Sequence, residues 1–135
     1  MTLRTPLDLA RLIARDGIAA QLVPVAGETP TVPLAAAALG VSPEQIVKTL
    51  VFIIRDSAIV VIARGDRLVD KKGLAARFDV GKKQVKLADA ETVLELTGYP
   101  VGGVPPFGHA ARLPVLLDGN IRVWDVVYAG GGDDH

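Results

Sequence analysis

The segment Thr49-Leu-Val-Phe-Ile-Ile-Arg-Asp-Ser-Ala-Ile-Val-Val-Ile-Ala63 contains the strongest β-strand signals of the chain. Two apolar runs rich in β-branched residues, Thr49–Ile54 and Ala58–Ala63, flank the polar residues Arg55-Asp56-Ser57, which is the pattern of a β-hairpin. Apolar residues occupy both faces of each run. We therefore expect a hairpin in a sheet that is covered on both sides.

Upstream of the hairpin, capping residues predict three helices. These begin at Thr5-Pro6, Pro33 and Ser42-Pro43, and the first two end at Gly17 and Gly40. We also expect a strand over Ala19–Val25 and a loop over Gly27–Thr31.

Downstream of the hairpin, helices and strands mix without a strict βαβ rhythm. Two predicted helices are capped by Asp70 and Asp89 and end near Phe78 and at Gly98. Short strands are predicted over Gln84–Leu87, Pro114–Leu117 and Arg122–Tyr128. The predicted fold class is α/β (mixed): a single domain over residues 1–135 with a curved, mostly antiparallel mixed sheet flanked by helices.

Composition narrows the class of protein. The chain has 135 residues, half of them apolar, which is enough for the core of one domain. Fifteen basic and fifteen acidic residues balance, which argues against generic binding of long nucleic acids. The absence of cysteine excludes disulfides and thiolate chemistry, and the two histidines and scattered acids show no metal-ligand spacing. No signal peptide and no apolar run of membrane-spanning length is present, so we expect a soluble, cytoplasmic protein without metal or cofactor.

The segment Tyr99–His109 is rich in glycine and proline, and no regular element fits it. Glycines let a backbone approach a ligand closely, and prolines fix the shape of a loop. The segment is therefore either a structural crossover or a loop that presents main-chain groups to a substrate. It is not a P-loop, because no Gly-Lys-Ser/Thr follows it. His109 is a candidate proton carrier, although a structural role is favoured.

Three further features admit two interpretations each. Lys48 shares a strand face with apolar neighbours, so it either reaches the rim of the sheet or points into a pocket. The run from Lys71 to Lys86 holds six basic residues and one acidic residue, a local charge of +5, and is either a phosphate-binding patch or a solvated surface. The glycines at 130–132 either line a site or form a flexible end.

Taken together, these blocks resemble the YbaK/prolyl-tRNA-synthetase-associated editing domain family. The matching blocks are Pro33–Gly40, Ile46–Phe52 and Leu96–Gly108, and the resemblance spans about Thr5 to Gly132. Members hydrolyse the ester between a wrong amino acid and the terminal adenosine of a tRNA, usually the proline tRNA. The resemblance implies a free-standing trans-editing deacylase that acts on the acceptor 3′ end and works beside prolyl-tRNA synthetase.

The resemblance also implies the site. Lys48 matches the family lysine that engages the 3′ end or the aminoacyl ester, and Gly102 and Pro106 match the ends of the family's Gly-x-x-x-Pro loop. The implied catalytic residues are Lys48, Gly102 and Gly103, and the implied substrate-binding residues are Pro106, Gly130, Gly131, Lys82 and Lys83. A ribose hydroxyl and main-chain groups, rather than a side-chain base, would do the chemistry. Relatives usually continue past the glycine run with another strand and a helix, so the chain resembles a member shortened at its C-terminus. Family residues beyond Gly132 then have no counterpart in this chain, and a role of His135 stays open.

Two other classes stay open on sequence grounds. One is a non-catalytic module that binds tRNA or a synthetase. The other is a small-nucleotide-binding protein that uses the glycine loop. The motifs do not specify the amino acid removed or the oligomeric state, since pocket shape decides the former.

Overall fold

The computed structural model describes residues 3–23 and 31–132. Its helices are α1 (Pro6–Asp16), α2 (Val32–Leu39), α3 (Lys71–Arg77) and α4 (Ala90–Thr97). Its strands are β1 (Val47–Ile54), β2 (Ser57–Arg64), β3 (Val85–Leu87) and β4 (Val115–Leu117). Short 3-10 helices cover Pro43–Gln45, Lys82–Gln84 and Gly119–Val123.

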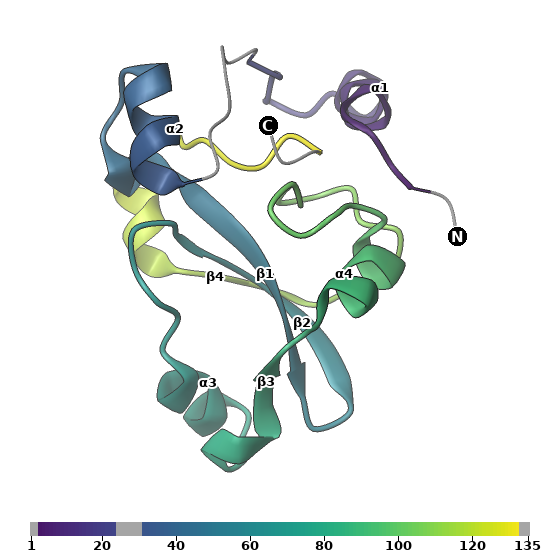
Figure 1. Ribbon diagram of the computed structural model, residues 1–135, viewed down its shortest axis with the longest axis vertical. Helices are drawn as coiled ribbons and strands as arrows, with labels where there is room; N and C mark the ends of the chain where they lie inside the picture. Colours follow the sequence, from purple (N-terminus) through teal and green to yellow (C-terminus); the bar gives the residue numbers. More distant parts are fainter. Residues whose placement is uncertain (1–2, 24–30, 133–135) are drawn as a thin grey trace.

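One sheet holds all four strands in the order β3-β1-β2-β4 (Figure 1). The predicted hairpin is confirmed: β1 and β2 pair antiparallel, with Ile54 opposite Ser57 and Val47 opposite Arg64. β3 adds antiparallel to the last residues of β1, and β4 adds parallel to β2. The sheet is therefore mixed and mostly antiparallel, as the sequence predicts.

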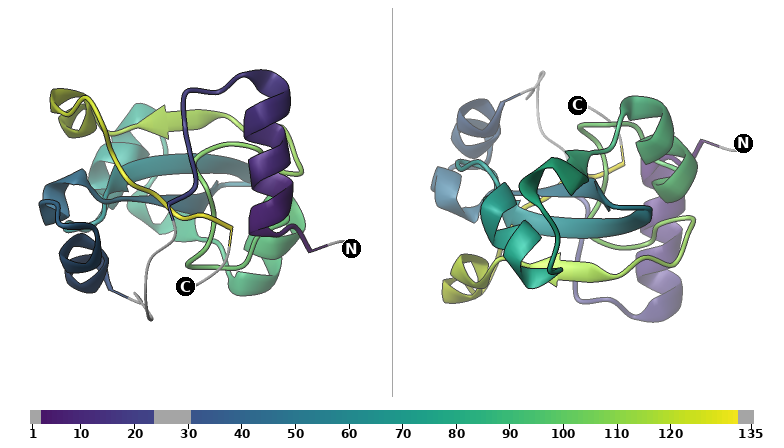
Figure 2. Two further views of the ribbon diagram at one scale, coloured as in Figure 1. Left: turned by 90° about the horizontal axis from the view of Figure 1, so that it is seen from above. Right: turned by 90° about the horizontal axis from the view of Figure 1, so that it is seen from below.

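Each face of the sheet supports its own apolar core. One core joins Val51 and Val60 to residues from α1, α4 and the 99–110 loop. The other joins Phe52 and Ile59 to Leu74 and neighbours on α3 and β3. Figure 1 shows α1, α4 and the loop on one side of the hairpin and α3 on the other, and both views of Figure 2 agree. The prediction of a sheet covered on both sides is confirmed.

Capping residues fix the helix ends largely as predicted. Thr5 and Asp8 form a reciprocal capping box at the start of α1, and Asp89 accepts a hydrogen bond from the main-chain N–H of Thr92 in α4. Gly17 ends α1 in the left-handed conformation. Asp70 precedes α3 as predicted, but its side chain makes no capping hydrogen bond.

Two predicted strands are wrong. Within Ala19–Val25, residues 19–23 form no strand, and residues 24–25 lie outside the described residues, as do residues 27–30 of the predicted loop. In place of a strand over Arg122–Tyr128, the chain forms a 3-10 helix up to Val123 and then a single parallel bridge from Tyr128 to Ile46. Only Tyr128 reaches the edge of β1, and the rest of the segment does not run along a strand. The valines of this segment are consequently exposed, Val123 by 77%.

Candidate functional site

The glycine- and proline-rich segment of residues 99–110 forms an irregular loop, as predicted, over the sheet face that α1 and α4 cover. Tyr99 is 1% exposed, and Val104 and Pro105 are also buried. Tyr99 and Val104 belong to the same core as Val51 of β1. The loop is thus seated on the sheet by its own apolar side chains.

Hydrogen bonds hold the loop at both ends. At the first end, Thr97 Oγ1 donates to Val93 O (2.7 Å) and accepts from Tyr99 N (3.0 Å). At the other end, Arg4 Nη1 donates to Gly108 O (2.6 Å). His109 Nε2 lies 2.7 Å from Pro105 O, which can only accept, so Nε2 donates. Little ordering is therefore left for a ligand to impose.

The two glycines implied to be catalytic differ in their surroundings. Gly102 is exposed and has φ 90°, a conformation that favours glycine. Gly103 is buried, and its N–H donates to Pro100 O (3.0 Å) while its O accepts from Gly132 N (2.8 Å). Pro106 is half-buried at the end of the motif. Of the two glycines, Gly102 is therefore the one that the loop exposes.

The glycine run returns to this loop. A β-carbon at position 130 would lie 2.7 Å from Val104 O and 3.1 Å from the carbonyl carbon of Gly103, so only glycine allows this approach. At Gly131 a β-carbon would meet Leu22 at an ordinary 3.5 Å. Tyr128 forms main-chain hydrogen bonds with Gln45 and Val47 at the start of β1. From there the chain continues through the glycine run to the loop. The structure brings Gly102, Gly103, Pro106, Gly130 and Gly131 together.

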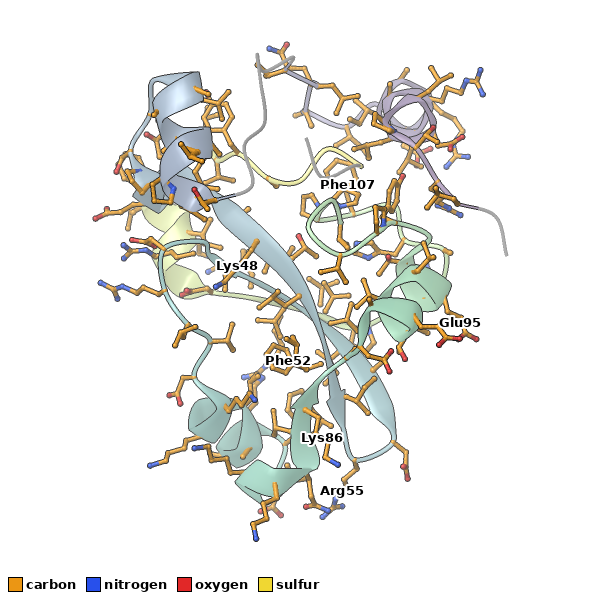
Figure 3. All side chains as sticks on the ribbon, viewed as in Figure 1. Lys48, Phe52, Arg55, Lys86, Glu95 and Phe107 are labelled. Carbon is orange, nitrogen blue, oxygen red and sulfur yellow. The ribbon has the colours of Figure 1, made fainter. Side chains whose placement is uncertain are left out.

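Lys48 does not join that group. It is half-buried in β1, and strand alternation gives it the face of Phe52, which packs with α3. In Figure 3 Lys48 and Phe107 of the loop lie on opposite sides of β1. The side chain of Lys48 and the loop therefore occupy different faces of the sheet.

Thr49 is the residue of this block that sequence reasoning passed over. Alternation places it on the face of Val47 and Val51, which pack in the core that includes Val104 of the loop. Thr49 is 9% exposed, and its Oγ1 is buried without a hydrogen-bond partner among the described residues. No sequence pattern signals such an orphan, because its partners are set by the tertiary fold.

The basic run lies at the far end of the hairpin from the loop (Figure 3). Lys82 and Lys83 lie in the 3-10 helix before β3. A hollow of about 340 Å³ is lined by Arg55, Asp56, Lys83, Gln84 and Lys86. Arg55 is a candidate that the sequence marks only as a cation in a predicted hairpin turn. Its N–H donates to Gln84 O (3.0 Å), which joins the turn to the basic run.

A second charged groove lies between α1 and α4. It encloses about 690 Å³, and its lining includes Arg4, Arg11, Arg15, Asp8 and Glu95. Arg15 is paired with Asp16 (2.8 Å), so this groove carries less unbalanced positive charge than the hairpin end.

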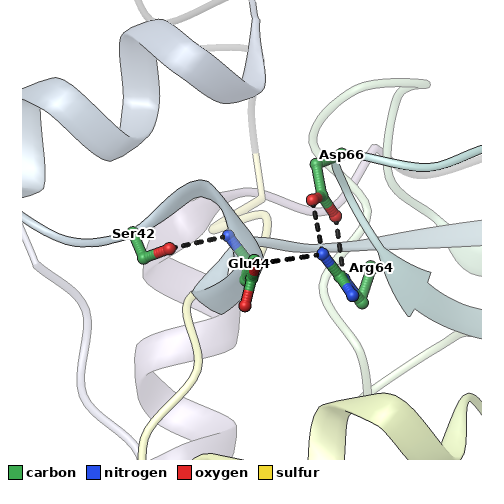
Figure 4. A network of polar contacts seen from close by, with 4 residues as sticks. All are labelled: Ser42, Glu44, Arg64 and Asp66. Atoms are coloured by element: carbon green, nitrogen blue, oxygen red, sulfur yellow. Dashed lines mark hydrogen bonds and ion pairs between the residues drawn. The ribbon is translucent and has the colours of Figure 1, made fainter.

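An ion-pair cluster holds the turn that precedes β1 (Figure 4). The buried Arg64 donates from Nε and Nη2 to the carboxylate of Asp66 (3.0 and 2.6 Å) and lies 3.5 Å from Glu44. Ser42 Oγ accepts from Glu44 N (3.3 Å). The hydrogen bonds from Arg64 hold the pKa of Asp66 below its usual value. This cluster fixes the start of the strand that carries Lys48 and Thr49.

Two further properties concern titration and metal binding. Burial lowers the pKa of His109, so its neutral form is favoured. In the part of the chain that the structure describes, no three His, Cys, Asp or Glu residues cluster as a metal site. The described helices also include none that is long and apolar enough to cross a membrane.

A sequence model of the aminoacyl-tRNA editing domain matches residues 26–135. The chain belongs to the aminoacyl-tRNA editing domain family. A solved structure described as a proposed trans-editing enzyme for prolyl tRNA synthetase superimposes with a TM-score of 0.84 at 32% identity, covering 96% of this chain and 80% of that one. The editing-domain fold predicted from the sequence is thereby confirmed.

Relatives identified by sequence support membership of the same family. Proline–tRNA ligase of Thermoanaerobacter sp. (strain X514) is 31% identical over 83 residues, which are 62% of this chain and 15% of that ligase. The chain thus spans about a sixth of the ligases that it matches. The uncharacterized protein YwhH of Bacillus subtilis (strain 168) is 39% identical over 103 residues, 76% of this chain and 64% of YwhH. These likenesses support a role in aminoacyl-tRNA editing.

Proposed function

We propose that this editing domain is a trans-acting deacylase that hydrolyses the ester of mischarged aminoacyl-tRNA, with mischarged proline tRNA as its substrate. The proposal rests on the family together with one observation. The exposed, left-handed Gly102 stands in a loop that hydrogen bonds and buried side chains fix in place. A rigid loop with an accessible peptide unit suits a site that works through main-chain groups.

The proposed chemistry needs no side-chain base. Water adds to the ester carbonyl, and the negative charge that develops on its oxygen is met by main-chain N–H groups of the loop. Collapse of this intermediate breaks the bond to the ribose oxygen, which takes up the proton given up by the attacking water, and the free amino acid leaves. One fixed donor to such an oxyanion contributes on the order of 100-fold or more in rate. Because the N–H of Gly103 is already bonded, we assign the donor role to the exposed part of the loop around Gly102.

We assign Lys48 to tRNA binding rather than to the chemical step. Its side chain shares a sheet face with α3, whose neighbourhood carries the basic run. We infer that Lys48 binds a phosphate near the 3′ end of the tRNA, as a point charge. Lys83, with Arg55 and Lys86 around the same hollow, and the neighbouring Lys82 then bind phosphates farther along the acceptor strand. Pro106, Gly130 and Gly131 border the ester on the loop face.

Prolyl-tRNA synthetase is the proposed working partner, since editing modules of this family also occur within proline–tRNA ligases. A protein with this substrate would work in the cytoplasm, where tRNA is charged.

A non-catalytic binding module is the second candidate. The placement of Lys48 away from the loop favours it, because a divided site suits recognition without cleavage. The deciding experiment incubates the protein with proline tRNA charged with proline, alanine, cysteine, serine or threonine and measures free amino acid. Faster release from one mischarged form than from the cognate form is expected. Binding without release would replace the deacylase by the module.

A further inference from the structure

Thr49 carries a hydroxyl that the fold does not use. Its Oγ1 is buried and has no partner among the described residues. Such groups are rare, because a buried polar atom loses its bonds to water and gains none in return. Valine has nearly the same shape without that cost. The hydroxyl at this position therefore calls for an explanation other than stability.

The unpartnered hydroxyl of Thr49 lies on a defined face of the sheet. Thr49 lies between Val47 and Val51 on the sheet face that supports the 99–110 loop, and both valines pack in one core with Val104. Its hydroxyl thus belongs to the layer between β1 and the loop, whereas the next side chain upstream, Lys48, belongs to the other face.

The backbone at Thr49 is also available on one edge. Val47 N donates to Tyr128 O, and Val51 O accepts from Ala88 N, so both residues use the edge of β1 that faces away from β2. Alternation points the N–H and C=O of Thr49 to the same edge. The pairing of β1 with β3 begins only at Phe52, and no described strand pairs with Thr49 on this edge. A ligand chain that crosses this unpaired edge passes from the sheet face of Lys48 to the sheet face that the 99–110 loop covers.

We propose that Thr49 is a substrate-binding residue whose Oγ1 hydrogen-bonds the ribose of the esterified terminal nucleotide. The inference rests on the proposed deacylase function and extends it. The 3′ end would cross the open edge of β1, with a phosphate at Lys48 on one face and the ester under Gly102 on the other. A ribose hydroxyl both donates and accepts, and so does the threonine hydroxyl that it meets. Because Oγ1 is buried in the free protein, the side chains that cover it must move aside before this bond is made in the complex.

The test compares Thr49→Val with Thr49→Ser in the full chain, by melting temperature and by steady-state deacylation. Thr49→Val is expected to keep or raise the melting temperature and to lower kcat/KM by roughly tenfold, the value of one hydrogen bond. Thr49→Ser should restore most of the activity. Thr97→Val is the matched control, because Thr97 is 0% exposed and its hydroxyl is bonded to Val93 and Tyr99. That variant should lower the melting temperature.

Two results overturn the assignment. In the first, Thr49→Val keeps wild-type kcat/KM. In the second, it lowers the melting temperature as much as Thr97→Val does, which would mean that the hydroxyl is satisfied within the fold.

Failure of the deacylase proposal is separable from failure of this one. If the wild-type protein releases no amino acid, the same variants are compared for binding of an adenosine that carries alanine on its 3′ position through an amide. Weaker binding by Thr49→Val then supports the assignment, whereas equal binding, or no binding by the wild-type protein, overturns it.

Discussion

Lys48 and Thr49 are consecutive residues of β1, and their side chains lie on opposite faces of the sheet. Lys48 shares its face with Phe52, which packs with α3. Thr49 has the opposite face, which it shares with Val47 and Val51, and these valines pack in the core that includes part of the loop. A single sequence block therefore supplies a cation to one face and a hydroxyl to the other. This division leads us to separate phosphate binding by Lys48 from ester chemistry at the loop.

Lys48→Ala should fold normally and lose most deacylation at limiting tRNA. If Lys48 binds a phosphate, the loss appears mainly as a higher KM, because binding is removed rather than transition-state stabilisation. Separate determination of kcat and KM, with the melting temperature as the check on folding, measures this. Arg112→Ala, an exposed basic residue outside the basic run, is the control and should change neither constant by more than a small factor. Wild-type turnover at limiting tRNA by Lys48→Ala would remove it from the site.

Replacement of Lys82 and Lys83 by glutamate should weaken tRNA binding and flatten its dependence on salt. For each phosphate that is no longer neutralised, the slope of log K against log salt falls by about 0.7 to 0.9, because fewer counterions are released. Adding Arg55→Glu, from the same hollow, should extend the effect. Binding titrations over a salt series test this, and single-turnover rates at saturating tRNA should stay nearly constant.

The control for that series reverses charge on the other basic surface. Arg11 and Arg15 line the groove between α1 and α4, and their replacement by glutamate makes the same change in net charge as the Lys82 and Lys83 pair. The hairpin-end variant should lose more affinity than this one. The opposite order would move the path of the RNA to α1, and equal, small losses would reduce the basic run to a solvated surface.

His109 should make the folded state less stable in mild acid. Burial lowers its pKa in the folded protein below the ordinary value of about 6.5, so the unfolded chain binds the proton more readily. Stability is unaffected well above that pH and falls as the pH drops below it. The melting temperature of the wild-type protein should thus decline more between pH 7.5 and pH 5 than that of His109→Gln. Equal declines would mean that His109 is protonated without cost in the fold.

The sequence predicts those parts of the fold that depend on local signals. The hairpin was predictable because two long apolar runs flank a polar turn, and the helices because threonine, serine, aspartate and glycine mark their ends. The strand predicted over Arg122–Tyr128 failed because the segment meets the edge of β1 through one bridge at Ile46 and does not run along that edge. The strand propensity of a segment does not determine how far it pairs with a sheet, because that pairing depends on the tertiary fold.

The candidate site likewise has parts that the sequence predicts and parts that it does not. The Gly-x-x-x-Pro loop and the glycine run could be picked out from composition, and the structure brings them together. That Lys48 lies on the far face, and the basic run at the far end, depends on the phase of the strand and on where α3 packs. The orphan hydroxyl of Thr49 and the hollow beside Arg55 arise from tertiary contacts alone, so residue types could not reveal them.

Gly102→Ala should lower the single-turnover deacylation rate at saturating substrate by about 100-fold, the value of one main-chain donor to an oxyanion. Its φ of 90° also makes an alanine strained, by about 1 kcal/mol, so some loss of melting temperature is expected. Gly17→Ala is the matched control, since Gly17 has φ 63° with open space around it at the end of α1. It should lose similar stability and keep the rate.

His109→Ala completes the comparison, because His109 neighbours the same loop and is the only histidine within the described residues. We assign it the bond to Pro105 O and no proton transfer, so its variant should lose stability and only a small part of the rate. A rate equal to wild type in Gly102→Ala together with an inactive His109→Ala would establish a side-chain acid or base at this site. In that case the main-chain mechanism proposed for the loop would be wrong, even though the loop would still be the place where the ester is cleaved.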